Sequence, residues 1–271
     1  MKNSSVRKSL GLCIGMAVFS ALNVLAGYEL DTANRILVVT LGSGEEQTFD
    51  AQYEDCLANN QVTNVIKRGN GTLVMGTTNR SAYTGDFTVE AGTLSYAGNN
   101  ALGSLASGSL KIFVKNGATL RRKGGSLIGK TVYFEGEGVD GIGALCADSY
   151  GDNPWGKSVA MTADALITCN GACSFTYGTT FEMAGHTLRI RQRSNPDSDV
   201  GFKGVNFYRL GTSEASPGTI VVEQGKCYVA DGRNWPSAGG LGTLVLTNST
   251  SFKISGLYPA ANLDWSWVWA S

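Results

Sequence analysis

Acidic and basic side chains near the middle of the chain are the residues best suited to chemistry. Three acids lie near one another in the sequence, and three arginines alternate along one extended segment: Asp148, Asp152, Asp164, Arg189, Arg191 and Arg193. Hydrolysis of a glycosidic bond needs two carboxylates, and a lyase needs acids that bind Ca²⁺ together with a basic proton abstractor. We favour solvated loop acids and a solvated strand face. The alternative is a carbohydrate-active enzyme, either a polysaccharide lyase or a glycoside hydrolase.

His186 is the only histidine of the chain, and it stands in the turn-like phrase Gly185-His186-Thr187-Leu188. A Ser-His-Asp triad or a zinc site would rest on this residue alone. The scattered cysteines do not form the two paired knuckles of a structural zinc site. The sequence therefore predicts a turn role for His186, and it predicts no catalytic residue, no cofactor and no metal site.

Two loops rich in polar and aromatic residues, 146–157 and 231–240, are the predicted contact surface. The first loop carries Asp152 and Trp155, and the second carries Trp235. Tryptophan offers a large apolar ring with one polar handle, which suits contacts at a surface. Asp152, Trp155 and Trp235 are therefore the candidate ligand contacts, and a lectin-like glycan-binding module is a further alternative.

The composition favours short strands joined by tight turns. The 271 residues include 36 glycines, and charged residues make up only 16%. Glycine adopts positive φ without a Cβ clash, so it suits such turns. Hydrophobic residues make up 42% of the chain, which is enough for a core. The formal net charge is zero, so no basic excess is present to pair with phosphates, and nucleic-acid binding is disfavoured.

Residues 1–26 have the pattern of a signal peptide. A basic start with Lys2, Arg7 and Lys8 precedes an apolar run over 10–25, and Val24-Leu25-Ala26 offers a small-residue cleavage site. A membrane anchor is the alternative, but the run of about 16 residues is short for a span. We therefore expect a mature chain without a membrane span, either secreted or on the outer cell surface.

Five cysteines lie beyond the predicted signal peptide: Cys56, Cys146, Cys169, Cys173 and Cys227. Export permits disulfides, and an odd count leaves at least one thiol unpaired. Cys169 and Cys173 are close enough in sequence to bridge across a turn. Reduced cysteines that pack as small hydrophobic side chains are the alternative, so the pairing stays open at this point.

A recurring phrase organises the chain: a short alternating strand, a glycine-centred turn, then Thr-Leu. Its leucine falls at Leu73, Leu94 and Leu120, with spacings of 21 and 26, and Leu166 and Leu188 show a similar spacing of 22. Repetition at this interval indicates a solenoid, in which each coil buries its apolar face only by stacking on its neighbours. We predict an all-β fold, a β-solenoid with loop excursions.

The stretch 66–120 resembles the autotransporter-associated β-strand repeat, also called the passenger-associated transport repeat. The resemblance is carried by Lys67, Gly69-Asn70-Gly71-Thr72-Leu73, Tyr83-Thr84-Gly85, Val89, Ala91-Gly92-Thr93-Leu94 and Asn99-Asn100-Ala101-Leu102-Gly103. It implies a single-stranded right-handed parallel β-helix in an exported bacterial surface protein. In such proteins the repeat aids passage and folding of a passenger stalk. The classical family ends in a C-terminal β-barrel, whose long amphipathic strands do not follow here.

We therefore expect a signal peptide over 1–26, an N-terminal cap and first coils over 27–65, and a β-helix repeat domain over 66–271. The abrupt end at Ser271 also fits a truncated reading frame. The expected function is a structural or adhesive, non-catalytic passenger or stalk protein of a bacterial cell surface. The expected partners are glycans or surface proteins of a host or the environment.

Overall fold

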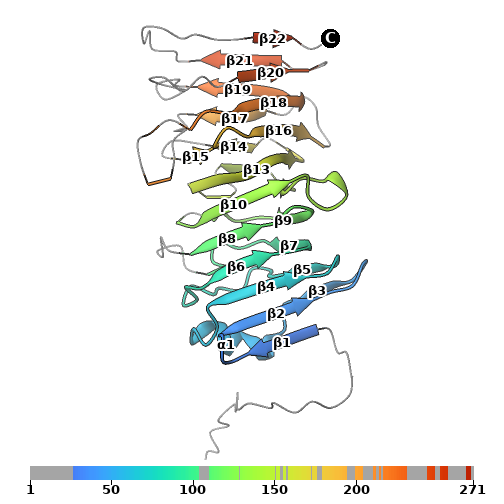
Figure 1. The fold of residues 1–271 in the computed structure, drawn as a ribbon, viewed down its shortest axis with the longest axis vertical. Helices are drawn as coiled ribbons and strands as arrows, with labels where there is room; N and C mark the ends of the chain where they lie inside the picture. Colours follow the sequence, from blue (N-terminus) through green and yellow to red (C-terminus); the bar gives the residue numbers. More distant parts are fainter. Residues whose placement is uncertain are drawn as a thin grey trace, which may run out of the picture.

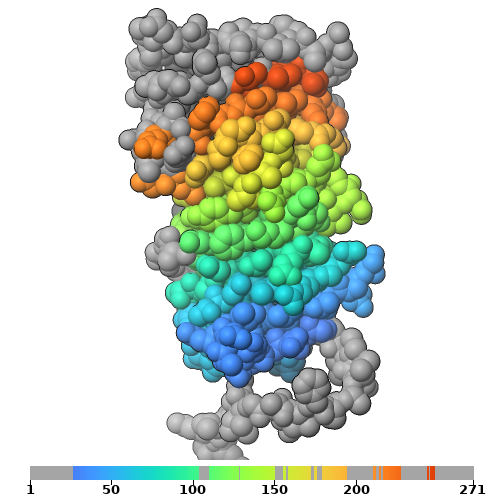
Figure 2. Space-filling model, in the orientation of Figure 1, coloured from blue at the N-terminus to red at the C-terminus, as the bar shows by residue number. Residues whose placement is uncertain are grey.

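The computed structural model describes the chain over 27–103, 110–127, 129–149, 151–152, 155–156, 158–171, 173–175, 179–193, 199–203, 210–211, 214, 216–230, 243–247, 251–255 and 267–269. The predicted signal peptide and Trp235 lie outside the described residues. The described part is an elongated stack of coils that runs from the N-terminal to the C-terminal strands (Figure 1), and its space-filling surface keeps the same order along the long axis (Figure 2).

The strands form three columns that run along the stack. The first column contains β1 (Gly27–Asp31), β2 (Ile36–Thr40), β4 (Asn64–Arg68), β6 (Asp86–Val89), β8 (Lys111–Val114), β10 (Thr131–Gly136), the first half of β13 (Ser158–Cys169) and β15 (Thr180–Glu182).

The second column faces a different side of each coil. It contains β3 (Glu46–Thr48), β5 (Thr72–Val74), β7 (Gly92–Tyr96), β9 (Ala118–Arg122), β11 (Leu145–Ala147), the second half of β13, β16 (Thr187–Gln192), β18 (Thr219–Gln224), β20 (Thr243–Leu246) and β22 (Trp267–Trp269). The third column is a five-stranded sheet of β12 (Gly151–Asp152), β14 (Cys173–Phe175), β17 (Asp199–Lys203), β19 (Lys226–Ala230) and β21 (Ser251–Ser255).

Parallel pairing between successive coils confirms the predicted all-β solenoid. Among the described strands only β1 pairs antiparallel, with β2. The described helices are short: η1 (Ala51–Tyr53), α1 (Glu54–Ala58) and η2 (Val139–Gly141). The handedness of the solenoid and the predicted domain boundaries stay predictions.

The core is a set of ladders in which one inward side chain per coil stacks on the next. In the second column the recurring leucines align, since Leu73 pairs with Leu94 and Leu94 pairs with Leu120. Leu145 continues this ladder, and all four side chains are almost fully buried. The register predicted from the repeated phrase is therefore confirmed in this part. The spacing of 22 between Leu166 and Leu188 does not correspond to a pairing, because Leu188 pairs with Ala165.

The N-terminal end of the stack is covered by an aromatic cluster. Tyr28 of β1 stacks on Tyr53 of η1 at a centroid distance of 4.6 Å and meets the edge of Phe49. The short helix α1 lies at the same end (Figure 1) and buries Cys56 and Leu57.

Lys67 occupies an inward position of β4 that is apolar in the neighbouring coils. Val39 and Val89 flank it in the ladder, and its side chain is buried. The ammonium donates to the backbone carbonyls of Arg68, Gly69 and Ala91 at 2.7–3.2 Å. A buried cation without a carboxylate needs such acceptors. Lys67 thus ties together the turns of two successive coils.

Further buried cations bind turn carbonyls in the same way. Lys130 donates to the carbonyl of Gly103. Arg80 donates to the carbonyls of Met75 and Ala101, and its other nitrogens pair with Glu54 of α1. Because coil turns leave carbonyl groups unpaired inside the stack, cationic side chains complete the hydrogen bonding of the interior.

Candidate functional site

Trp155 lies inside the solenoid, so the prediction that this residue is exposed for ligand contact is wrong. Its side chain has no exposed surface, and its ring lies 5.8 Å from that of Phe175 in β14. Phe175 in turn meets the edge of Phe181 of β15. The indole N–H has no hydrogen-bond partner among the described residues. The burial of a large apolar ring outweighs the cost of this unpaired donor.

The other two candidate contacts stay predictions. The backbone of Asp152 belongs to β12, but its side chain and all of Trp235 fall outside the described residues. The disulfide between Cys169 and Cys173 also stays a prediction. Cys169 ends β13 and is buried, whereas Cys173 begins β14 in the third column, and its side chain is not described.

The acids that suggested an enzyme do not all converge. Asp148 directly follows β11, and the register places it beside Asn170. Asp164 lies six residues before Asn170 along β13. At about 3.3 Å per residue, the backbones of the two acids are separated by about 20 Å along the strand direction. This exceeds the separation of a retaining or an inverting carboxylate pair.

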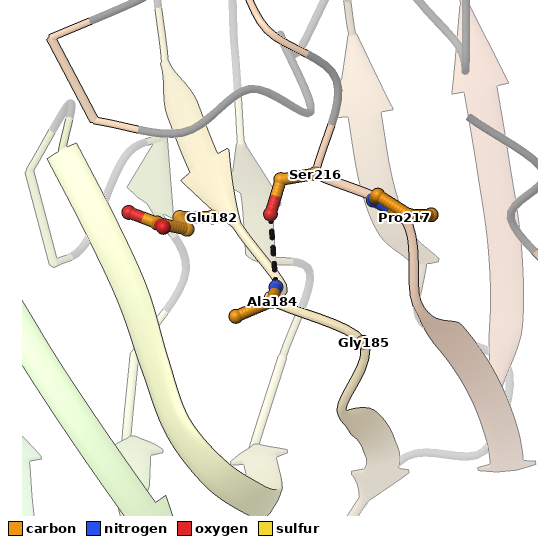
Figure 3. A pocket seen from close by; sticks show the side chains of 5 residues that line it. All are labelled: Glu182, Ala184, Gly185, Ser216 and Pro217. Atoms are coloured by element: carbon orange, nitrogen blue, oxygen red, sulfur yellow. Dashed lines mark hydrogen bonds between the residues drawn. The ribbon is translucent and has the colours of Figure 1, made fainter. Parts of the chain in front are cut away.

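A hollow of about 440 Å³ lies beside β15 and is lined by Glu182, Ala184, Gly185, Ser216 and Pro217 (Figure 3). The hydroxyl oxygen of Ser216 accepts from the backbone N–H groups of Met183 and Ala184. The carboxylate of Glu182 points away from Ser216 in Figure 3 and accepts from the N–H of Leu210. Both polar side chains therefore hold neighbouring backbone in place.

A smaller hollow of about 340 Å³ contains two carboxylates, Glu135 and Asp164. Glu135 accepts from the N–H of Asn116 and the hydroxyl of Thr162. Asp164 accepts from the N–H of Thr187 at 2.7 Å. Each carboxylate already serves a local hydrogen-bonding role.

His186 closes the turn that follows β15, as the sequence predicted. Its N–H donates to the carbonyl of Met183, and the turn between them places Ala184 and Gly185 at positive φ. The imidazole Nδ1 lies 3.8 Å from Asp164 on the surface. Among the described residues, no group of three or more His, Cys, Asp or Glu side chains is arranged to hold a metal ion.

The outer face of the second column carries a cluster of charged side chains that are joined by ion pairs. One row of residues, paired in register across four successive coils, consists of Arg121, Cys146, Thr168 and Arg191. The residues two positions later form a second row: Lys123, Asp148, Asn170 and Arg193. Cations therefore occupy the ends of both rows, and the single carboxylate stands between them. We call Arg121, Lys123, Asp148, Arg191 and Arg193 the basic patch.

Asp148 holds two guanidinium groups at once. Arg121 Nε and Arg193 Nη2 each lie 2.6 Å from one of its oxygens. Burial alone would raise the pKa of Asp148, but the hydrogen bonds from Arg121 and Arg193 outweigh burial and lower it below the ordinary value. The thiol of Cys146 lies beneath these groups, 3.9 Å from Asp148, and burial raises its pKa. A thiol held in the neutral form is a poor nucleophile.

A second shared carboxylate extends the cluster. Glu223 of β18 accepts from Arg189 Nε and from both Nε and Nη2 of Arg191. Arg189 also pairs with Glu137, from the loop between β10 and β11. The sequence correctly placed three arginines on one strand face. It named Asp148, the partner of Arg193, but it missed Glu137 and Glu223, which lie 32–52 residues from their arginines in the chain.

Comparison with known families supports the repeat seen in the sequence. Residues 65–95 match the family model described as Passenger-associated-transport-repeat. This match confirms the resemblance over β4 to β7, including Lys67 and its carbonyl partners. Searches of curated proteins and of solved structures returned no match. No helix in the described part of the chain has the length and apolarity needed to cross a bilayer.

Proposed function

We propose that this chain is an exported, non-catalytic rod that acts as a structural or adhesive passenger on a bacterial cell surface. The observation that carries the proposal is the transport-repeat match over residues 65–95 within a continuous parallel β-solenoid. A stack of coils gives a stiff rod, since each coil adds about 4.8 Å of length and is paired through its backbone with the coil before it. Such a rod suits a stalk.

The described polar groups support a structural role rather than catalysis. Asp148 and Glu223 are each shared between two arginines, and Asp164 binds backbone. Carboxylates held in these ion pairs are kept ionised, whereas a general acid needs a raised pKa.

Export is tested by determining where the chain is found in cells and whether residues 1–26 have been removed. The full chain, expressed in a bacterium from its own start, should leave the cytoplasm and begin at Gly27 when its N-terminus is sequenced. The matched control is Ile14→Arg, which places a charge in the apolar run and should keep the chain in the cytoplasm with residues 1–26 attached. Retention of the unaltered chain in the cytoplasm would contradict the proposal.

A further inference from the structure

We infer that the basic patch binds acidic polysaccharides through their carboxylate groups. The inference deepens the adhesive part of the proposed function and rests on it, because an exported rod meets such polymers outside the cell. It is carried by the arrangement of Arg121, Lys123 and Arg193 around one shared acid, Asp148.

The first argument is an uncompensated charge. Arg121 and Arg193 share Asp148, so two positive charges face one negative charge. Lys123 stands beside Asp148 in register, is exposed, and has no ion-pair partner among the described residues. Within the described part of the chain, the next carboxylate that acts on Arg121 is Glu46 of β3, three strands away and so about 14 Å along the stack. The excess positive charge is therefore local.

The second argument is preorganisation. The shared carboxylate fixes both guanidinium groups, and only about a third of the Arg121 side chain and a quarter of the Arg193 side chain remain exposed. Arg193 Nε is buried without a hydrogen-bond partner in the described structure. A guanidinium presents several donors in a planar fork that matches a carboxylate. Groups that are already ordered lose little entropy when they bind.

The third argument is shape. The patch runs along the stack from β9 to β16, about 14 Å, and has a width of two residues along the strands, about 7 Å. A narrow strip parallel to the long axis fits an extended polymer chain better than a compact ligand. The polymer is a polysaccharide rather than a nucleic acid, because the chain as a whole has no net charge to attract a dense polyphosphate.

Binding of the full chain to polygalacturonate, measured by calorimetry at about 0.02 M salt, tests the inference. The matched ligand control is the same polymer with its carboxylates methyl-esterified, which keeps the sugar backbone and removes the charge. We expect binding to polygalacturonate only, and a loss of at least about tenfold in affinity at about 0.5 M salt, where charges are screened within a few ångströms. Equal binding of both polymers, or tighter binding of double-stranded DNA, would overturn the inference.

Two variants separate recognition from damage to the fold. The double variant Arg121→Gln with Lys123→Gln removes two cations of the patch and should weaken binding by about tenfold. An unchanged affinity in this variant would overturn the inference. The matched control Arg68→Gln breaks an exposed ion pair with Glu90 on the first column and should leave affinity unchanged.

Failure of this test is distinguishable from failure of the proposed function. A chain that is exported and processed at Gly27 but ignores polygalacturonate would overturn the binding inference and leave the stalk role standing. A chain that binds the polymer but stays in the cytoplasm would overturn the proposed export and leave the binding inference standing.

Discussion

Replacing Lys67 with methionine removes an ammonium group that donates to three carbonyl oxygens inside the solenoid. Hydrogen bonds to a charged group contribute about 1.5–3 kcal/mol each. Burial of the charge opposes this stabilisation and lowers the pKa of Lys67 from 10.5 to about 8. That shift corresponds to about 3 kcal/mol against the charged form. The hydrogen bonds prevail, so we expect Lys67→Met to lower the free energy of unfolding by about 3 kcal/mol at pH 7.

The effect of Lys67→Met should grow with pH. Since the pKa of Lys67 is lower in the folded chain than in the unfolded chain, the unfolded chain binds more protons between pH 8 and pH 10.5. The free energy of unfolding of the unaltered protein therefore gains from this residue as the pH rises through that window. The difference between the unaltered protein and the variant should widen by up to about 3 kcal/mol.

Urea denaturation at several pH values from 7 to 10.5 measures this difference directly. Tyr28 and Tyr83 have raised pKa values and oppose the gain at the alkaline end, but they are present in both proteins and cancel. Lys115→Met, at an exposed position, is the matched control and should give a small, constant difference. A Lys67→Met difference that stays constant across the whole pH range would refute the reasoning from burial.

Three further changes probe the turns, the core and the basic patch. Gly92→Ala should lower the free energy of unfolding by at least about 2 kcal/mol, because φ is +69° and a Cβ would lie 2.3 Å from the carbonyl oxygen of Gly69. The control Gly117→Ala, at φ +79° with no atom near the new Cβ, should lower it by only about 1 kcal/mol. Trp155→Ala should cost about 3–5 kcal/mol in urea denaturation, and a cost under 1 kcal/mol would show that the indole is not a core side chain. Asp148→Asn should cost about 1 kcal/mol at pH 7, and this cost should vanish in denaturation curves as the pH falls through the lowered pKa of Asp148.

The ladder of the second column was predictable because one phrase recurs with little variation. Leu73, Leu94 and Leu120 each follow a Thr in the same short strand, and the structure stacks them in register. The similar spacing of Leu166 and Leu188 does not give a pairing, because Leu188 lies beside Ala165. Spacing alone cannot fix the register there, because the coils differ in length and a shift of one residue moves a side chain to the other face.

Trp155 shows a different limit of reading the sequence. It stands in a loop with acids, a proline and glycines, a composition that usually indicates exposure. Loop residues have no regular period, so nothing in the local pattern tells which side chain turns inward. Its neighbour in the core, Phe175, comes from the next coil, and only the folded stack brings the two rings together.

The basic patch begins where the regular repeat ends. Within the matched repeat, Lys67 of β4 points inward and bonds turn carbonyls, and Thr93 and Ser95 of β7 are buried. In β9 the position in register with Ser95 is Arg121, which is partly exposed. At this position of the second column a buried neutral side chain thus gives way to a partly exposed cation, whereas Lys130 beyond β9 still bonds a turn carbonyl inside the stack. The cations of the basic patch therefore all lie beyond the matched residues 65–95, and we expect recognition on this face to depend on that departure from the repeat.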